Sequence, residues 1–544
     1  MYKWAGRVFL FLNIVLFSTV VASENVLANN ISRAEFDWLM AENIVPAALA
    51  PQHQPRLATP TQKIVPLRYS QQSAITPSNS TMQRGLPYSV RELLQQSNIN
   101  PATMSAFVLR VGDREPMMVY NENIPRTPAS VMKILTTYAG LGVLGKNYRW
   151  PTEIYMQGNI RNGTLNGNLI VKGYGSPDFD NSDVREILRK VAQRGIRHFN
   201  GNLIFDNSYF QVANIDPGSF DGKPYETYNA QPDALMFQDR TSEFIVKNVG
   251  GRAKVFSSTP AKNVIIANNI RSVKSRCRGK ARSPHMSISR QGADYIVNFS
   301  GRYSTRCGPR SYKKAITDPS NMLYSSLVNH WKRDVGGNIN ARFVMGTKPH
   351  NAQLIYRHLS QPLHTIIREV NKDSHNIMAR QIMLSIAAKR LGAPANTHKG
   401  QQAINLWLRS VGLNFPELRI ENGSGLSRWS KISSRHIGEL LLHAYRSPNR
   451  QLLMNSLAVA GVDGTMRKRL RNTPIQGRGF FKTGTLRDTR AIAGYVRGHD
   501  GHYYIVSILQ NDQVARRRGK AAHDALIRWA YWDGKPPKEV ATLR

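Results

Sequence analysis

Ser130 and Lys133 are the first residues in this chain whose types and spacing fit a chemical reaction. They open a stretch with helical periodicity, and side chains at i and i+3 share a helix face, so the Lys133 amine can reach the Ser130 hydroxyl. A serine hydroxyl is a poor nucleophile until a base takes its proton. A lysine can be that base when burial and a nearby cation lower its pKa from about 10.4 toward 7. The pair therefore indicates acyl transfer through Ser130.

Ser-x-x-Lys is a short pattern that also arises by chance, and the chain holds a second copy, Ser311 to Lys314. That copy lies in a basic stretch after Cys307 with no helical period, so we expect it on the surface. A serine at the start of a helix is also common as a cap for free N–H groups. The pair at Ser130 therefore needs partners from elsewhere in the chain.

Two further motifs supply such partners. Ser374-His375-Asn376 forms a polar break between two apolar helical stretches, where a hydroxyl can relay a proton and an amide can hold a substrate carbonyl. Lys482-Thr483-Gly484-Thr485 lies inside a strand-like run, and Gly484 has no side chain, so a substrate backbone can lie close to that edge. Lys482 can pair with a carboxylate and help to keep Lys133 neutral. Together, in this order, the three motifs predict a serine acyl-transfer site.

The elements that position these motifs follow from the periodicity of the apolar residues. Helices are expected over residues 129–144, 363–370, 377–391, 436–445 and 514–532. Strands are expected over residues 106–111, 117–120, 480–485, 491–496 and 503–510. Residues 151–344 change to short strands separated by Gly and Asn, which predicts a β-rich insertion. The order favours an α+β fold, an antiparallel sheet flanked by helices with one large β-rich excursion.

The chain is divided accordingly into a signal peptide (1–28), a flexible arm (29–87), a catalytic domain in two segments (88–150 and 345–544) and inserted domains (151–344). Lys3 and Arg7 precede an apolar run shorter than the ~20 residues of a spanning helix, which favours a cleaved leader and a periplasmic protein. An uncleaved leader would instead tether the protein to the inner membrane. The arm is rich in Pro, Gln, Ser and Thr and has no hydrophobic period, so flexibility is expected.

The net charge of +39 is far larger than solubility requires. A basic surface attracts polyanions such as nucleic acid, anionic lipid or acidic wall polymers. The leader argues against nucleic acid, and so does the lack of zinc-finger, RNP and basic-zipper patterns. We expect anionic wall or outer-membrane polymers as partners, and a solvated basic face without a partner is the alternative.

Cys277 and Cys307 are the only cysteines. In an oxidising compartment a bridge between them is favoured over two buried thiols, and closing the loop from 277 to 307 would stabilise the fold by roughly 3.5 kcal/mol. No second histidine completes a zinc set with His436 and Glu439, and no Walker-type glycine loop precedes Lys482, so neither a metal nor a nucleotide cofactor is expected.

The three motifs resemble those of the penicillin-binding protein and serine β-lactamase superfamily, Ser-x-x-Lys, Ser-x-Asn and Lys-Thr-Gly. The spacing of the motifs narrows the resemblance to one group of this superfamily. Ser374 lies 244 residues after Ser130, and Lys482 lies 108 residues after Ser374. This spacing is similar to that of the class C low-molecular-mass penicillin-binding proteins, D-alanyl-D-alanine carboxypeptidases/endopeptidases of the peptidase S13 type, the penicillin-binding protein 4 group. Supporting stretches are Asn422–Arg428, Gly461–Thr465 and Ala493–Tyr495, and the match covers about residues 88 to 535.

The resemblance implies a transpeptidase-like fold and hydrolysis of the D-alanyl-D-alanine ends of peptidoglycan stem peptides, without a cofactor. Ser130 would form an acyl-enzyme, with Lys133 as general base and Ser374 passing the proton to the leaving amine. Asn376 would hold the peptide amide. The backbone N–H groups of Ser130 and Thr485 would form the oxyanion hole.

The same resemblance assigns the terminal carboxylate to Lys482, Thr483 and Thr485, next to Gly484. β-Lactam antibiotics such as penicillin would inhibit the enzyme because they carry a similar carboxylate. His375 in the middle of the second motif and Arg380, where the family usually has an acidic residue, depart from the pattern. Asp221 and Lys223 both lie near the segment that recognises a diamino acid in the family, which leaves the substrate preference open.

Two other functions fit part of the pattern. A serine β-lactamase shares the three motifs but lacks the long gap and needs a Glu-x-x-x-Asn element, for which we find no convincing match between the second and third motifs. A cationic wall-binding scaffold with the same fold would have lost catalysis, whereas all three motifs are intact here. Slow release of a penicillin acyl group would favour the peptidase over the lactamase, and a phenotype that survives Ser130→Ala would favour the scaffold.

Overall fold

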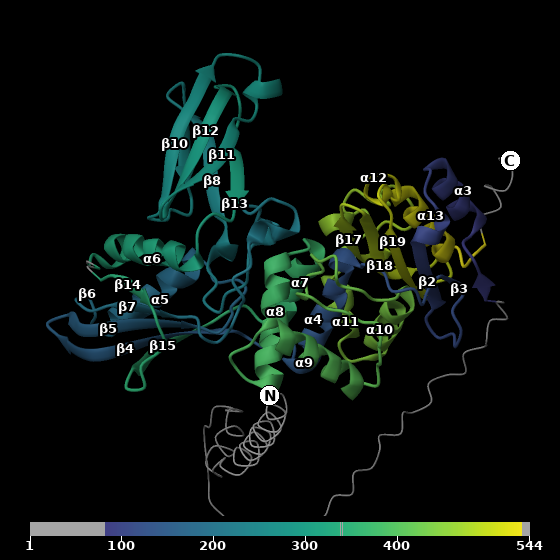
Figure 1. Cartoon of the computed structure of the whole chain (residues 1–544), viewed down its shortest axis with the longest axis horizontal. Coiled ribbons are helices and arrows are strands. Elements are labelled where there is room, and N and C mark those ends of the chain that lie inside the picture. The colour runs from purple at the N-terminus through teal and green to yellow at the C-terminus, as the bar shows by residue number, and fades with distance from the viewer. Residues whose placement is uncertain (1–81, 338, 340, 536–544) are drawn as a thin grey trace, which may run out of the picture. The chain divides into compact units, whose positions relative to one another are not determined.

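The computed structural model describes residues 82–337, 339 and 341–535, which have the α+β architecture predicted from the sequence (Figure 1). The predicted leader and most of the predicted arm lie outside these residues. In the described part of the chain, no helix is both long enough and apolar enough to cross a membrane.

A seven-stranded sheet carries the third motif and receives strands from both ends of the described chain (Figure 1). Its order is β1-β3-β2-β19-β18-β17-β16, and β19 pairs antiparallel with β2, Tyr504 opposite Arg110. The strands are β1 (Gln83–Arg84), β2 (Met104–Arg110), β3 (Met118–Tyr120), β16 (Ala458–Val459), β17 (Gly479–Leu486), β18 (Thr489–Arg497) and β19 (Tyr503–Asn511). The five predicted strands are confirmed, with ends shifted by one or two residues.

Both faces of this sheet are buried. Neighbouring residues of its strands point to opposite sides, so each strand contributes to two cores. Phe107 belongs to one core and Val108 to the other. The core around Phe107 includes α4 (Met132–Val143), α7 (Leu363–Lys372), α8 (Asn376–Leu391), α9 (Thr397–Ser410), α10 (Ser434–Arg446) and α11 (Arg450–Ser456). The core around Val108 includes α3 (Tyr88–Gln96) and α13 (Lys520–Tyr531). The first core therefore surrounds the helices that carry the first two motifs.

Two predicted helices differ from the structure. The helix predicted to begin at Ala129 starts with a 3-10 turn, Ala129–Val131, and continues as α4. The helix predicted over 514–532 is divided at Gly519 into α12 (Ala515–Arg518) and α13. A side chain at Gly519 would lie 2.3 Å from Oε1 of Gln510, so the close packing against β19 favours a glycine, which is a poor helix former.

The segment between α4 and α7 forms a sheet of its own, of order β14-β7-β5-β4-β15, with the short β6 beside β5. Its strands are β4 (Pro151–Arg161), β5 (Thr164–Gly173), β6 (His198–Phe199), β7 (Leu203–Asp206), β14 (Phe343–Met345) and β15 (Gln353–Leu359), and it packs against α5 (Asn181–Gln193) and α6 (Pro319–His330). β15 lies beyond the domain boundary placed at residue 344, yet it pairs with β4 from Gln353 to Leu359, with one irregularity between Leu354 and Tyr356.

Residues 242–314, which we call the cationic module, form two three-stranded sheets, β13-β8-β9 and β10-β12-β11. The strands are β8 (Ser242–Val249), β9 (Arg252–Ser257), β10 (Val264–Val273), β11 (His285–Gln291), β12 (Asp294–Ser304) and β13 (Arg310–Lys314). The two sheets share one small core that includes Phe244 and Phe299. Cys277 and Cys307 form the predicted disulfide. The second Ser-x-x-Lys copy lies on β13, where Ser311 is exposed, as predicted.

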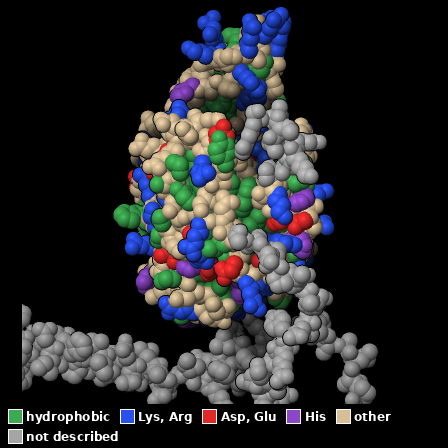
Figure 2. Space-filling view, turned by 90° about the vertical axis from the view of Figure 1, so that its right-hand side faces the viewer, with side chains coloured by type: hydrophobic (Ala, Val, Ile, Leu, Met, Phe, Trp, Pro, Cys, Tyr) green, Lys and Arg blue, Asp and Glu red, His purple; other side chains and the backbone are tan. Residues whose placement is uncertain are grey.

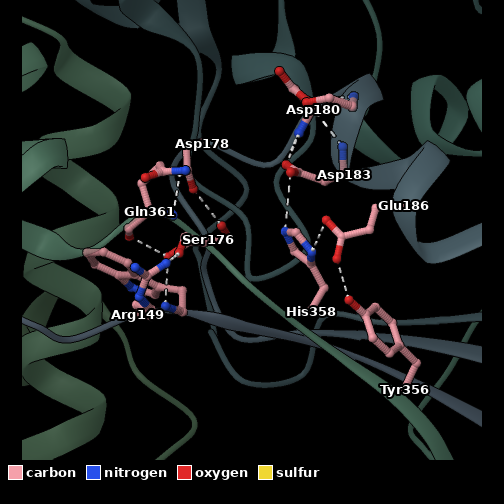
Figure 3. Close-up of polar contacts among 12 residues, drawn as sticks. Arg149, Ser176, Asp178, Asp180, Asp183, Glu186, Tyr356, His358 and Gln361 are labelled. Carbon is pink, nitrogen blue, oxygen red and sulfur yellow. Dashed lines mark hydrogen bonds and ion pairs between the residues drawn. The ribbon is translucent and has the colours of Figure 1, made fainter. Parts of the chain in front are cut away.

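A polar cluster joins the end of β15 to α5 (Figure 3). Nε2 of the buried His358 lies 3.2 Å from Oδ1 of Asp183, and its Nδ1 lies 3.7 Å from Oε2 of Glu186, which also accepts a hydrogen bond from Tyr356. Burial opposes a charged imidazole, but the hydrogen bond to Asp183 and the charges of both carboxylates outweigh burial and raise the pKa of His358. His358 therefore links the last inserted strand to α5.

We expect His358→Asn to remove a pH-dependent part of the stability. A histidine whose pKa is higher in the folded than in the unfolded chain stabilises the fold below its unfolded pKa of about 6.5, and this contribution is lost as the pH rises through the folded value. The difference in Tm between the native chain and the variant should therefore be larger at pH 5.5 than at pH 9. An equal difference at both pH values would contradict the charged state of His358.

Candidate active site

Ser130 lies on the 3-10 turn that leads into α4, partly exposed to solvent. The preceding residue, Ala129, has φ 46°, in the left-handed region that costs a non-glycine residue of order 1–3 kcal/mol. Two glycines from distant segments hold this turn. A side chain at Gly425 would lie 1.9 Å from the Ala129 carbonyl oxygen, and one at Gly484 would lie 2.6 Å from the Pro128 carbonyl oxygen and 3.0 Å from the Ser130 nitrogen. The strained turn is thus clamped between the Asn422–Arg428 loop and β17.

Lys133 lies fully buried one turn after Ser130, and its amine has three close neighbours. Nζ lies 3.0 Å from Oγ of Ser130, 2.7 Å from Oδ1 of Asn376 and 2.6 Å from the carbonyl oxygen of Ser424. The last two atoms only accept hydrogen bonds, so they use two N–H groups. A neutral amine has two N–H groups and one lone pair, and that lone pair then faces the Ser130 hydroxyl. The geometry fits a base that takes the serine proton.

The surroundings of Lys133 favour this neutral form. Burial is the main cause that holds its pKa well below the usual value, and the charges of Lys482 and Arg380 lower it further. Arg380 is itself buried, donates to the Ala230 carbonyl oxygen at 2.9 Å and has its pKa lowered to about 10. The arginine that departs from the family pattern is therefore one of the two cations that act on Lys133.

The second motif spans the gap between α7 and α8. Ser374 has φ 63°, so it turns the chain sharply between the helices, and its Oγ lies 2.9 Å from Nζ of Lys482. Asn376 is the first residue of α8; its Oδ1 accepts from Lys133, and its Nδ2 donates to the Tyr228 carbonyl oxygen at 3.2 Å. The amide is thus fixed in one orientation by a donor and an acceptor from two different segments.

The third motif lies on an exposed strand edge. β16 pairs with β17 only at Phe480 and Phe481, so from Lys482 onward this edge has no strand neighbour among the described residues. Lys482 is buried, and its Nζ donates to the backbone carbonyl oxygen of Thr483 at 2.9 Å. Burial lowers the pKa of Lys482 to about 7, against a smaller opposing effect of Asp373. A free backbone edge next to an amine with this pKa can accommodate a peptide that ends in a carboxylate.

The predicted site residues are therefore brought together from three distant segments. Hydrogen bonds link Ser130, Lys133 and Asn376, and a second one links Ser374 to Lys482. Gly484 lies against the nucleophile turn. Thr483 donates to Thr465 at 2.9 Å, and Thr485 is exposed at the same strand edge.

Three contributions were not predicted. The Ser424 carbonyl contacts Lys133, whereas the sequence of the Asn422–Arg428 loop supported only the family resemblance and predicted no contact with the site. The Tyr228 carbonyl orients Asn376, and the sequence indicated a part of this segment near the substrate only through the family resemblance at Asp221 and Lys223, not this contact. His375 lies 3.3 Å from Asp239; burial works against its charge, but the hydrogen bond and charge of Asp239 raise its pKa.

The residues considered for substrate preference and for zinc have other contacts in the structure. Asp221 accepts hydrogen bonds from Tyr228 and Asn229, both at 2.8 Å, and Lys223 approaches it only through its backbone N–H, at 3.2 Å. His436 lies 2.7 Å from Glu417. In the described part of the chain, no group of three or more His, Cys, Asp or Glu side chains is arranged to hold a metal ion.

Comparisons with known proteins agree with this geometry. The D-alanyl-D-alanine carboxypeptidase DacB of Haemophilus influenzae is 26% identical over 393 residues, 70% of this chain and 80% of the relative. The D-alanyl-D-alanine carboxypeptidase of an Actinomadura species is 26% identical over 433 residues, 76% of this chain and 79% of the relative. The crystal structure of penicillin-binding protein 4 from H. influenzae has the same fold, with a TM-score of 0.70 at 22% identity, over 82% of this chain and all of that one.

The match to the family itself extends over nearly all described residues, from 86 to 531, and includes the three motifs and the inserted segment between the first two. With Ser130, Lys133 and Asn376 joined by hydrogen bonds and Lys482 bonded to Ser374, this chain belongs to the D-Ala-D-Ala carboxypeptidase 3 (S13) family.

Proposed function

We propose that this protein is a serine-type D-alanyl-D-alanine carboxypeptidase/endopeptidase that acts on peptidoglycan peptides through an acyl-enzyme at Ser130 and is inhibited by penicillin. The single observation that carries the proposal is the position of Lys133. Its buried amine lies 3.0 Å from the Ser130 hydroxyl oxygen and contacts the acceptors of Asn376 and Ser424, so that in the neutral form its lone pair would face that hydroxyl. Membership of the S13 family supports the substrate class.

Acylation begins when Ser130 Oγ attacks the carbonyl carbon of the penultimate D-alanine and gives its proton to Lys133. The oxyanion that forms is stabilised by the N–H groups of Ser130 and Thr485, a kind of contact that contributes about 3 kcal/mol per donor. The proton then passes through the Ser374 hydroxyl to the leaving nitrogen, the C–N bond breaks and D-alanine leaves. Water attacks the remaining ester, and Ser130 recovers its proton.

The strand edge binds the end of the substrate. Its terminal carboxylate pairs with Lys482 and accepts hydrogen bonds from the hydroxyl groups of Thr483 and Thr485. Gly484 lets the substrate backbone approach β17, and Asn376 holds the peptide amide on the opposite side. Penicillin occupies the same positions with its own carboxylate and acylates Ser130.

Family membership and the similarity to cell-wall carboxypeptidases support an exported protein. We include in this proposal a leader that stays uncleaved and tethers the protein to the inner membrane. It concerns residues 1–28, which lie outside the described part of the chain.

The cationic module supports a second role, docking on anionic wall or outer-membrane polymers. Residues 242–314 hold 16 Lys and Arg but only two acidic residues, Glu243 and Asp294. Both acidic residues lie near the starts of their strands, Glu243 in β8 and Asp294 in β12. The far ends of these two strands lie together, since Asn248 donates to the Thr305 carbonyl at 3.0 Å. Around these ends the exposed cations are Lys247, Arg252, Arg271, Lys274, Arg276, Arg278, Lys280, Arg282, Arg302 and Arg306. Figure 2 shows Lys and Arg gathered at the upper end of the view, where Figure 1 places β8 and β10–β12.

Fluorescent penicillin tests the nucleophile. We expect a single adduct, on Ser130, by mass mapping of the labelled peptide, and none in Ser130→Ala. Ser311→Ala is the matched control, because it removes the other Ser-x-x-Lys serine, and it should label like the native chain. An adduct that persists in Ser130→Ala would overturn the assignment.

The pH dependence tests the role of Lys482. Its amine is charged below its pKa of about 7 and loses the charge above it, so carboxylate binding weakens as the pH rises. We expect kcat/KM for a D-Ala-D-Ala peptide to fall above pH 7, approaching tenfold per unit. Lys482→Arg keeps its charge and should lack this decline, whatever its maximal rate. The same decline in the arginine variant would assign the pH effect to another group.

Charge reversal tests the docking role. Each Lys or Arg near an anionic surface contributes about 1 kcal/mol, so Arg276→Glu with Arg278→Glu should weaken binding to purified lipopolysaccharide at least 30-fold in low salt. Lys389→Glu with Arg390→Glu, an equal change on an exposed end of α8, is the control and should have a much smaller effect. Equal losses in both variants would show that overall charge, and not the module, determines binding.

A further inference from the structure

His375 occupies the middle of the second motif, between the Ser374 hydroxyl and the Asn376 amide, and the proposed function gives it no role. Its Nε2 lies 3.3 Å from Oδ2 of Asp239, which belongs to the inserted segment 151–344. The other polar atoms of the two side chains, Nδ1 of His375 and Oδ1 of Asp239, are buried and have no hydrogen-bond partner among the described residues. Each side chain therefore depends on the other for its polar contact.

The loop that carries Ser374 has little support from its own backbone. Within the described residues, the N–H and the carbonyl of Ser374 make no hydrogen bond with another backbone group. Its φ of 63° lies in the left-handed region, which costs a non-glycine residue roughly 1–3 kcal/mol unless the surroundings hold it. Side chains therefore hold this serine in place. His375 is its immediate neighbour, so a fixed imidazole also restricts the position of the Ser374 hydroxyl.

The turn that carries Asp239 is strained and firmly held. Gln238, Asp239 and Arg240 have φ values of 50°, 53° and 52°, all in the left-handed region. The N–H of Gln238 donates to the Phe179 carbonyl at 3.0 Å, and Arg240 pairs with Asp318 at 2.9 Å. Strained backbone persists where the surrounding structure determines it, and it is typical of functional sites. The Asp239 carboxylate thus faces the second motif from a fixed position.

The groups around His375 favour a charged imidazole. Burial is the largest influence and lowers the pKa of His375, and the charge of Lys133 acts in the same direction. The hydrogen bond and charge of Asp239, together with the charge of Glu369 on α7, outweigh both and raise the pKa. A hydrogen bond between charged groups is about twice as strong as one between neutral groups, so this contact can hold the loop.

We propose that the ion pair between His375 and Asp239 positions the Ser374 hydroxyl for proton transfer to the leaving amine, so that the inserted segment takes part in acylation. The proposal rests on the proposed function, because it explains what supports the serine that passes the proton there. The proton still moves from Lys133 through Ser374 Oγ to the leaving nitrogen as the C–N bond breaks. His375 and Asp239 are positioning residues, which act only through Ser374.

The leaving group provides a measurement that a purely structural role would not change. An amine must be protonated as it leaves, whereas a thiol with a pKa of about 8.5 leaves as the thiolate. A thioester with the same acyl group and the same terminal carboxylate therefore needs Ser130 and Lys133 but no proton from Ser374. Ser374→Ala is the reference variant. It should lower kcat/KM for the amide peptide about 100-fold and cut the thioester nearly as well as the native chain.

In the full-length protein, Asp239→Gly and His375→Ala should show the same pattern to a smaller degree. We expect the ratio of kcat/KM for the amide to that for the thioester to fall roughly tenfold in each variant. The ratio should fall no further when both changes are combined, because both remove the same contact. Glycine adopts a φ of 53° without strain, so Asp239→Gly removes the carboxylate and keeps the turn.

Gln238→Gly is the matched control, because it makes the same exchange one residue earlier on the turn and outside the ion pair. It should leave the ratio unchanged, and an equal fall there would overturn the proposal by assigning the effect to the backbone of the turn. A constant ratio in Asp239→Gly and His375→Ala would also overturn it. Failure of the proposed function would look different, since the native chain would then cut neither substrate and penicillin would not acylate Ser130.

Discussion

The amine of Lys133 is the group on which the rest of the site depends. It lies in the first core of the protein, out of contact with water, and it contacts Ser130, Asn376 and the Ser424 carbonyl at once. Each contact comes from a different segment, so α4, α8 and the Asn422–Arg428 loop must all be packed before this amine has its neighbours. The site is therefore assembled only when the buried helices around the central sheet are packed.

The motifs were predictable because each combines chemistry with local structure. Ser130 and Lys133 are separated by one helical turn, Ser374 and Asn376 interrupt two apolar helices, and Lys482 begins a motif on a strand with a glycine. Such short-range patterns appear directly in the order of residues. The strands of the central sheet were predictable for the same reason, since their apolar runs are long and bounded by turns.

Backbone contacts were not predictable. The carbonyl oxygens of Ser424 and Tyr228 orient Lys133 and Asn376. Every residue has a backbone carbonyl, so the residue types at these positions do not reveal such contacts. The left-handed turns at Ala129 and Ser374 were missed because neither residue favours that conformation by itself. At Ala129 the glycines that allow the turn, Gly425 and Gly484, lie about 300 residues or more further along the chain.

The low pKa of Lys133 also affects the folding equilibrium. Once the chain unfolds, this side chain meets water and regains an ordinary pKa, so between the lowered folded pKa and the ordinary pKa unfolding takes up a proton there. The unfolded state then binds more protons than the folded state, and the free energy of unfolding rises with pH over that interval. The buried Lys133 thus makes the folded chain more sensitive to acid, and the hydrophobic packing of α4 and α8 has to compensate for that loss.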